Sequence, residues 1–232
     1  MCFSPAADFT AAAVLAPMGV LTLRAARNRN ELVVASIPMI FAVHQFVEAF
    51  VWLGAKGEVS HDTQKVAIYI YLGIAQVLLP IVVPLAVLLV EPSAKRRKFM
   101  WFAFAVGVAL GLQYAGILIR HHTGAYPLAH TMVYKTSVQP PWFAGLGYAI
   151  AVGFTTLASS HRYLVYFGIL NIIGISVAGA VRYEAVTSIW CVYAAFISVL
   201  IYLFLKLPRT PSGPGDPGFW HRGAPAEPAV AV

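Results

Sequence analysis

The chain has 232 residues, of which 59% are hydrophobic and only 11% are charged. A soluble domain typically has about twice that share of charged residues, so the composition predicts an integral membrane protein. The net charge of +7 is explained by basic loops on the cytoplasmic side of a membrane, and nucleic-acid binding is not expected. Only two cysteines are present, Cys2 and Cys191, which excludes a disulfide-rich fold and leaves one bridge or two thiol ligands.

Seven apolar segments predict an all-α integral membrane protein with seven transmembrane helices. The fifth segment is the weakest because it is short and glycine-rich, and Pro80 and Pro84 predict a kink in the third. Residues 1–206 are expected to form the transmembrane domain, and residues 207–232, rich in Pro, Gly and Ala, a disordered cytoplasmic tail. The expected spans are residues 5–23, 32–54, 65–90, 99–119, 142–159, 163–181 and 185–206.

The distribution of Lys and Arg predicts the orientation of these helices. Cytoplasmic segments carry an excess of Lys and Arg, and here the excess follows the first, third, fifth and seventh helices. The N-terminus is therefore expected outside and the C-terminus in the cytoplasm. The residues expected in the cytoplasm are Arg24, Arg27, Arg29, Lys95, Arg96, Arg97, Lys98, Arg162, Lys206, Arg209 and Arg222, against Lys56, Lys65, Arg120, Lys135 and Arg182 outside.

The second apolar segment carries polar residues that are rare in a membrane span. His44, Gln45 and Glu48 lie within it and Trp52 follows, at spacings that place them on one side of a helix. A carboxylate within the hydrocarbon region costs a few kcal/mol and usually has a function. Glu48 therefore marks a candidate functional site.

Polar residues of other helices are expected at the depth of Glu48. With the N-terminus outside, Glu48 lies about 9 Å below the outer end of its helix, at 1.5 Å per residue. Gln113, Ser176 and Cys191 are expected at a similar depth, with Ser188 one helical turn above Cys191. These positions predict a polar site in the outer half of the bilayer.

The outer loop of residues 120–141 is expected to cover this site. Long ordered loops are often lids or binding loops, and this one carries His130 and Tyr134. The predicted arrangement is an outward-opening pocket with His44 and Glu48 at its floor.

Three segments, MCFSPAADF, HQFVEAFVW and SIWCVYAAFISVLIY, resemble an uncharacterised family of bacterial multi-pass membrane proteins. Its members share a Met-Cys-Phe-Ser start, a Gln-x-x-Glu-x-x-x-Trp helix and a late Ser-x-Trp-Cys segment. The resemblance implies a multi-pass protein of the bacterial cytoplasmic (inner) membrane and supports the positions of a site, but it implies no reaction. The matching positions are Cys2, Phe3, Ser4, Gln45, Glu48, Trp52, Ser188, Trp190 and Cys191, with His130 and Tyr134 as a loop element.

One hypothesis is a metal site formed by Cys2, Glu48, Cys191 and either His130 or His44. Thiolate, imidazole and carboxylate ligands together suit a Zn, Fe or Cu ion. Glu48 would then be the catalytic residue of an outward-facing membrane metalloenzyme that acts on a lipid or a small apolar molecule. The residues expected to bind the substrate are Gln45, Trp52, Gln113, Tyr134, Ser188 and Trp190.

Two other readings remain open at the level of the sequence. A disulfide between Cys2 and Cys191 would tie the first helix to the seventh in a structural or assembly protein. Glu48 would then be an interhelical contact, either as a protonated carboxyl or as a partner of Gln113. A transporter is the second alternative, although few polar residues continue the path on the cytoplasmic side of His44. The substrate, the metal and the oligomeric state do not follow from these patterns.

Overall fold

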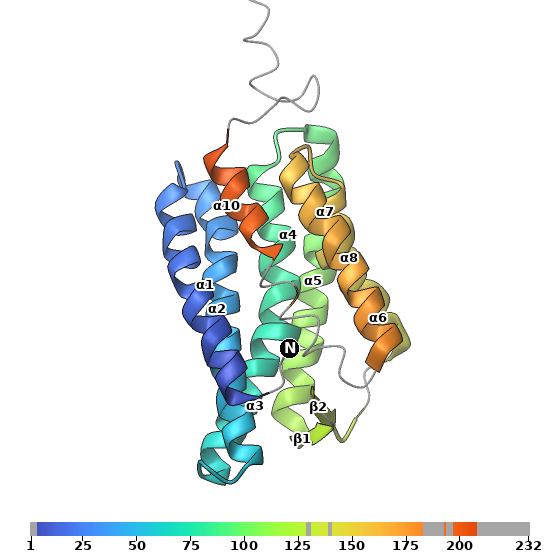
Figure 1. The fold of residues 1–232 in the computed structure, drawn as a ribbon. Coiled ribbons are helices and arrows are strands. Elements are labelled where there is room, and N and C mark those ends of the chain that lie inside the picture. The colour runs from blue at the N-terminus through green and yellow to red at the C-terminus, as the bar shows by residue number, and fades with distance from the viewer. Residues whose placement is uncertain (1–3, 129–130, 139–140, 183–192, 194–196, 208–232) are drawn as a thin grey trace, which may run out of the picture.

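The computed structural model describes residues 4–128, 131–138, 141–182, 193 and 197–207. This part of the chain is a bundle of helices with a short β-hairpin at one end (Figure 1). The chain is thus mostly helical, as expected, and the topology of seven spans stays a prediction. Among the described residues, four helices are long and apolar enough to cross a membrane: Pro5–Ala25, Arg29–Ala55, His61–Val90 and Ala94–Arg120.

The first two helices, α1 (Pro5–Ala25) and α2 (Arg29–Ala55), form an antiparallel pair. Each begins at a polar residue whose side chain accepts a hydrogen bond from a backbone N–H of the first turn. Ser4 caps α1 and Asn28 caps α2 in this way. In the short turn between the two helices, the backbone N–H of Arg27 also donates to the carboxyl group of Glu31, at 2.9 Å, so side chains satisfy two backbone donors where α2 starts.

The third helical segment is interrupted by a wider, π-helical turn. It consists of α3 (His61–Leu72), the π-helical turn η1 (Gly73–Leu78) and α4 (Leu79–Val90). Pro80 has no N–H and its ring crowds the carbonyl four residues earlier, so the turn before it cannot keep α-helical hydrogen bonding. The irregularity expected in this segment thus lies before Pro80, whereas Pro84 lies within regular α-helix.

The next helix, α5 (Ala94–Arg120), packs closely against η1 and α4. Two glycines make this approach possible. A Cβ atom at Gly107 would overlap the backbone carbonyl oxygen of Pro80, and one at Gly111 would lie 2.7 Å from the side chain of Ile81. Small residues at such positions allow helix backbones to approach one another in membrane proteins.

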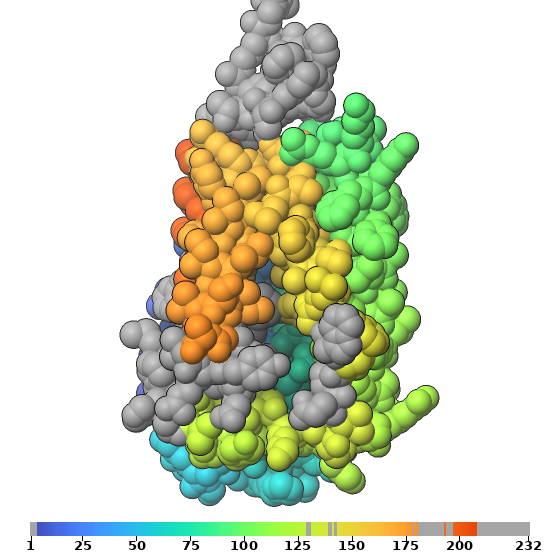
Figure 2. All heavy atoms as spheres, turned by 90° about the vertical axis from the view of Figure 1, so that its right-hand side faces the viewer, coloured from blue at the N-terminus to red at the C-terminus, as the bar shows by residue number. Residues whose placement is uncertain are grey.

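The loop between α5 and the next helix contains an antiparallel hairpin of β1 (Thr123–Leu128) and β2 (Thr131–Thr136). The hairpin was not expected from the sequence, although its second strand is rich in β-branched residues and Tyr. Met132 and Val133 are buried, so β2 packs into the bundle. Figure 2 shows the hairpin in yellow-green beside the cyan turn that joins α2 to α3.

The rest of the described chain is helical. A short segment is built from α6 (Trp142–Tyr148), the π-helical turn η2 (Ala149–Phe154) and α7 (Thr155–Leu157), and is followed by α8 (Arg162–Arg182) and α10 (Val199–Lys206). Half of the seventh expected span, and all but one residue of the expected tail, lie outside the described residues.

Hydrogen bonds between turns hold together the end of the bundle opposite the hairpin. The Arg96 guanidinium donates to the carbonyls of Ala158, at 3.2 Å, and Ser159, at 2.7 Å. The Arg27 guanidinium donates to the carbonyl of Leu205 at 3.0 Å. The turns after α1, α4 and α7 and the C-terminal end of α10 therefore lie at one end of the molecule, which we call the basic end (Figure 1).

A buried carboxylate completes this network. Glu91 is only 3% exposed and accepts hydrogen bonds from the backbone N–H and the hydroxyl of Ser160, at 2.7 and 2.5 Å. It also accepts from the hydroxyl of Ser159, at 3.4 Å, and from the backbone N–H of Ser93, at 3.1 Å. Because both of its carboxyl oxygens accept hydrogen bonds, Glu91 joins the α4–α5 turn to the α7–α8 turn.

Candidate functional site

Three aromatic rings from three different elements stack inside the hairpin end of the bundle. The ring of His44, on α2, stacks on that of Tyr71, on α3, with centroids 4.0 Å apart and planes inclined by 28°. Tyr134, on β2, stacks on the other side of Tyr71, at 4.4 Å and 9°. The stack therefore connects the hairpin to the interior of the helix bundle.

The polar residues of α2 are buried beside this stack. His44, Gln45 and Glu48 are all 0% exposed and Trp52 is 5% exposed. Their spacing places them on the side of α2 that packs against the other helices, as the sequence predicts. The carboxyl group of Glu48 thus lies in the interior, about 10 Å from the C-terminal end of α2 at 1.5 Å per residue.

Several of these buried groups have no hydrogen-bond partner in the described part of the chain. They are both ring nitrogens of His44, both amide atoms of Gln45 and the indole N–H of Trp52. The backbone of Tyr71 lies near the His44 ring, but no bond of good geometry joins them. A buried polar group without a partner costs about 1–3 kcal/mol, so this concentration of such groups marks the interior face of α2 as the candidate site.

A second buried carboxyl lies at the same end of the bundle. Asp8, in the first helical turn of α1, is 0% exposed. Its neighbour Phe9 packs edge-to-face on Phe46 and Phe50 of α2, at 5.5 and 5.7 Å, which sets this turn of α1 beside the turn that carries Glu48. The sequence reasoning missed Asp8, because an acidic residue in the first turn of a helix is common for reasons of capping and helix dipole alone.

Two further residues, Gln113 and Ser176, were expected at the level of Glu48. Gln113 is half-buried on α5. Ser176 is exposed on α8. The expectation that α5 and α8 bring these two side chains to the level of Glu48 stays a prediction.

The metal hypothesis depends largely on residues that the structure does not describe. Within the described ranges, no group of three or more His, Cys, Asp or Glu side chains is arranged to hold a metal ion. Of the expected ligands, His44 and Glu48 are described and buried. The remaining expected site residues, Cys2, His130, Ser188, Trp190 and Cys191, lie outside the described residues.

Comparison of the chain with curated proteins and with solved structures gives no match. A family model described as "Family of unknown function (DUF6629)" matches residues 1–214, which include every residue that the structure describes. The match also covers the three segments whose motifs resemble an uncharacterised membrane protein family, so that recognition is confirmed. The chain therefore belongs to the DUF6629 family, whose function is unknown.

Proposed function

We propose that this protein is a multi-pass membrane protein with seven transmembrane helices and an outward-facing, metal-binding site beneath the hairpin. The observation that carries the proposal is the concentration of buried polar groups on α2, where His44, Gln45 and Trp52 have unpartnered atoms among the described residues. In this proposal, Glu48 and one histidine, His44 or His130, bind the ion with two thiols.

The physical reason for a metal ion is the cost of the buried groups. A carboxylate in a membrane interior requires a cation or a set of donors, and an imidazole without a partner requires an acceptor, a donor or a metal. An ion bound to His44 would meet the second requirement, and Glu48, four residues later on the same side of α2, would be a second ligand. Cys2 and Cys191 would supply the thiolates expected from the sequence, which suits a Zn, Fe or Cu ion.

The chemistry of such a site would depend on what enters beneath the hairpin. A bound ion would supply Lewis acidity, and Glu48 would either bind that ion or accept a proton from the substrate. The amide of Gln45 and the indole N–H of Trp52 would then orient a polar group of the substrate. Because the site would lie in the half of the bundle nearer the outer leaflet in the proposed orientation, a lipid or small apolar molecule is the substrate class we expect.

Metal analysis of the protein purified in mild detergent tests this proposal. The unsubstituted chain is expected to contain near-stoichiometric metal, and Glu48→Gln and Cys191→Ala are each expected to abolish it. Glu91→Gln is the matched control, since Glu91 is also a buried carboxyl but lies at the basic end with protein donors around it. That variant is expected to keep the metal, with folding of all variants checked by circular dichroism.

The opposite result would support a structural or assembly protein. If the purified chain contains no metal and mass spectrometry finds Cys2 and Cys191 oxidised to each other, the metal proposal is wrong. The thiols would then stabilise the fold by a disulfide. In that case Glu48→Gln is expected to alter stability only.

A further inference from the structure

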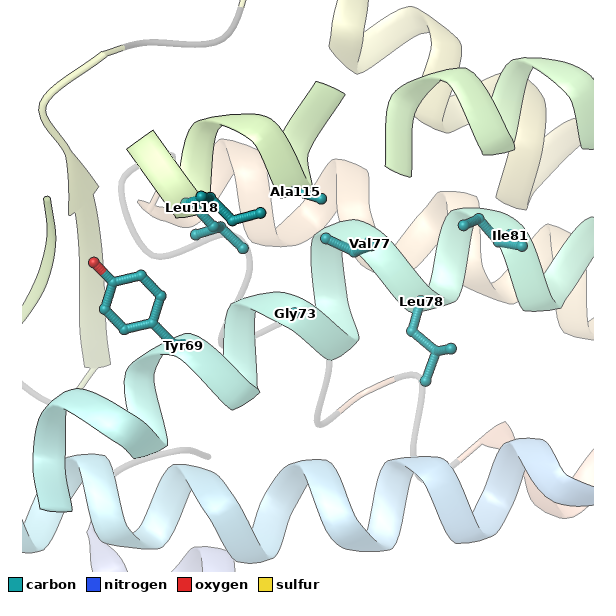
Figure 3. Close-up of a pocket in the computed structure, with 8 residues that line it drawn as sticks. Tyr69, Gly73, Val77, Leu78, Ile81, Ala115 and Leu118 are labelled. Atoms are coloured by element: carbon teal, nitrogen blue, oxygen red, sulfur yellow. The ribbon is translucent and has the colours of Figure 1, made fainter. Parts of the chain in front are cut away.

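An apolar groove of about 660 Å³ lies on the outside of the bundle, between the third helical segment and α5 (Figure 3). Its volume is within the range of about 300–1,000 Å³ that is typical of ligand sites. Leu78 and Ile119 at its edges are exposed, so the groove opens outwards. Its other walls are formed by Tyr69, Gly73, Val77, Ile81, Ala115 and Leu118.

The groove exists because side chains are missing or small where two helices face each other. Gly73 begins the π-helical turn η1, and a Cβ atom added there would meet no other atom within 4 Å. Its backbone has helical dihedral angles, φ −58° and ψ −42°, so the conformation does not require glycine. Ala115, which also lines the groove, has only a methyl group.

The groove has a polar end and an apolar end. At the hairpin end, the hydroxyl of Tyr69 donates to the backbone carbonyl of His121 at 3.5 Å. Lys65 lies one helical turn beyond Tyr69 on α3, and Arg120 follows Ile119 at the end of α5; both cations are exposed. In the other direction the groove continues to Ile81, deep in the span, along apolar side chains.

We propose that this groove binds one acyl chain of an anionic phospholipid, whose phosphate lies between Lys65 and Arg120. An apolar channel that ends at two cations matches a chain that ends at an anionic headgroup. The groove is distinct from the buried site, because Leu118 lies between them and also packs in the cluster that contains Trp52 and Tyr71. The proposal rests on insertion of these helices in a membrane and is independent of metal binding.

Native mass spectrometry of the protein in detergent tests the proposal. The delipidated protein is incubated with equal amounts of phosphatidylglycerol and phosphatidylcholine that have the same acyl chains, and the lipid retained on the protein is measured. The unsubstituted chain is expected to retain phosphatidylglycerol preferentially. Gly73→Leu, which fills the groove, is expected to reduce retention of both lipids at least about tenfold, a change of about 1.4 kcal/mol.

The matched control is Gly116→Leu. Gly116 is also a helical glycine with nothing within 4 Å of an added Cβ atom, but it does not line the groove. This variant is expected to retain lipid like the unsubstituted chain. If Gly73→Leu does not fold, Ala115→Leu serves in its place, with exposed Ala109→Leu on the same helix as its control.

The two cations are tested separately from the groove. Lys65→Gln and Arg120→Gln are each expected to lower the preference for phosphatidylglycerol about fivefold, since one basic residue near an anionic lipid contributes about 1 kcal/mol. Binding of phosphatidylcholine is expected to persist in both variants. Equal retention of lipid by Gly73→Leu and Gly116→Leu, or no preference for phosphatidylglycerol in the unsubstituted chain, would overturn the proposal.

Discussion

The rings of Tyr134 and Tyr71 lie almost parallel, with their centroids 4.4 Å apart and their planes inclined by 9°. Tyr134 belongs to the hairpin, and Tyr71 belongs to α3 and also stacks on His44. The hairpin is thus held against the helices by a contact that continues to the buried polar residues of α2. Any movement of the hairpin away from the bundle has to separate this stack first.

Replacing Tyr134 with Ala is therefore expected to loosen the hairpin. Loss of the stacked ring is expected to lower the free energy of unfolding by about 1–3 kcal/mol and to speed amide hydrogen exchange in residues 123–136. Tyr126→Ala is the control, because Tyr126 lies on the other strand and is 45% exposed. It is expected to change stability by less than about 0.5 kcal/mol.

A double-mutant cycle of Tyr134→Ala and Tyr71→Ala measures the stack itself. The expected coupling energy is about 0.5–1.5 kcal/mol, the range of aromatic pairs beyond the burial of their surface. Strictly additive effects of the two substitutions would show that the rings touch without stabilising the hairpin.

Glu91→Gln is expected to destabilise the basic end. The amide offers one acceptor oxygen in place of two carboxylate oxygens, while the donors on Ser93 and Ser160 remain. Hydrogen bonds to a charged acceptor contribute about 1.5–3 kcal/mol, so a loss of about 2 kcal/mol is expected in thermal or denaturant unfolding in detergent. Exposed Glu58→Gln is the control and is expected to have little effect. Equal stability of the two variants would contradict the structural role of Glu91.

Gly107→Ala is expected to force α5 away from α4. The added methyl group would overlap the carbonyl oxygen of Pro80, a backbone atom that cannot rotate aside. Overpacking of this kind costs about 1–3 kcal/mol. Gly116→Ala is the control, since its Cβ atom would meet no other atom within 4 Å, and better helix propensity is expected to leave its stability equal or higher. The midpoint temperature of thermal unfolding is the measurement, and it is expected to fall for Gly107→Ala but not for Gly116→Ala.

The long helices could be predicted from the sequence because a membrane span requires about 20 consecutive apolar residues. The ends of these helices could not be predicted in the same way. Helical hydrogen bonding continues into polar residues on either side of the apolar segment. The second helix was expected from residue 32 but begins at Arg29, where Asn28 caps it. The fourth expected span started at residue 99, whereas α5 begins at Ala94 and includes the basic residues before that span.

The candidate site could be predicted only for residues whose relative positions follow from their spacing along one helix. The spacing of His44, Gln45 and Glu48 is a property of α2 alone, and their shared burial follows from it. Tyr71 was missed because its importance comes from rings on two other elements. The role of Glu91 was missed for the same reason: its donors on Ser160 lie 69 residues later in the chain.

The orientation of the bundle gives the last prediction. The structure sets the turn that contains Arg27 and the start of α5, which contains Arg96, at one end and the hairpin at the other. Since cytoplasmic loops carry the excess of Lys and Arg, the hairpin is expected outside the cell membrane. Lys135→Cys and Lys95→Cys are matched probes, because both positions are exposed, one in β2 and the other at the start of α5.

A membrane-impermeant maleimide applied to intact spheroplasts is expected to label Lys135→Cys above the level of the parent chain. Lys95→Cys is expected to react only after the membrane is permeabilised. The parent chain is measured alongside because Cys2 and Cys191 contribute a background of their own. The reverse pattern would place the hairpin and the polar residues of α2 on the cytoplasmic side. Any substrate would then have to reach Glu48 from within the cell, and the groove between α3 and α5 would face the inner leaflet.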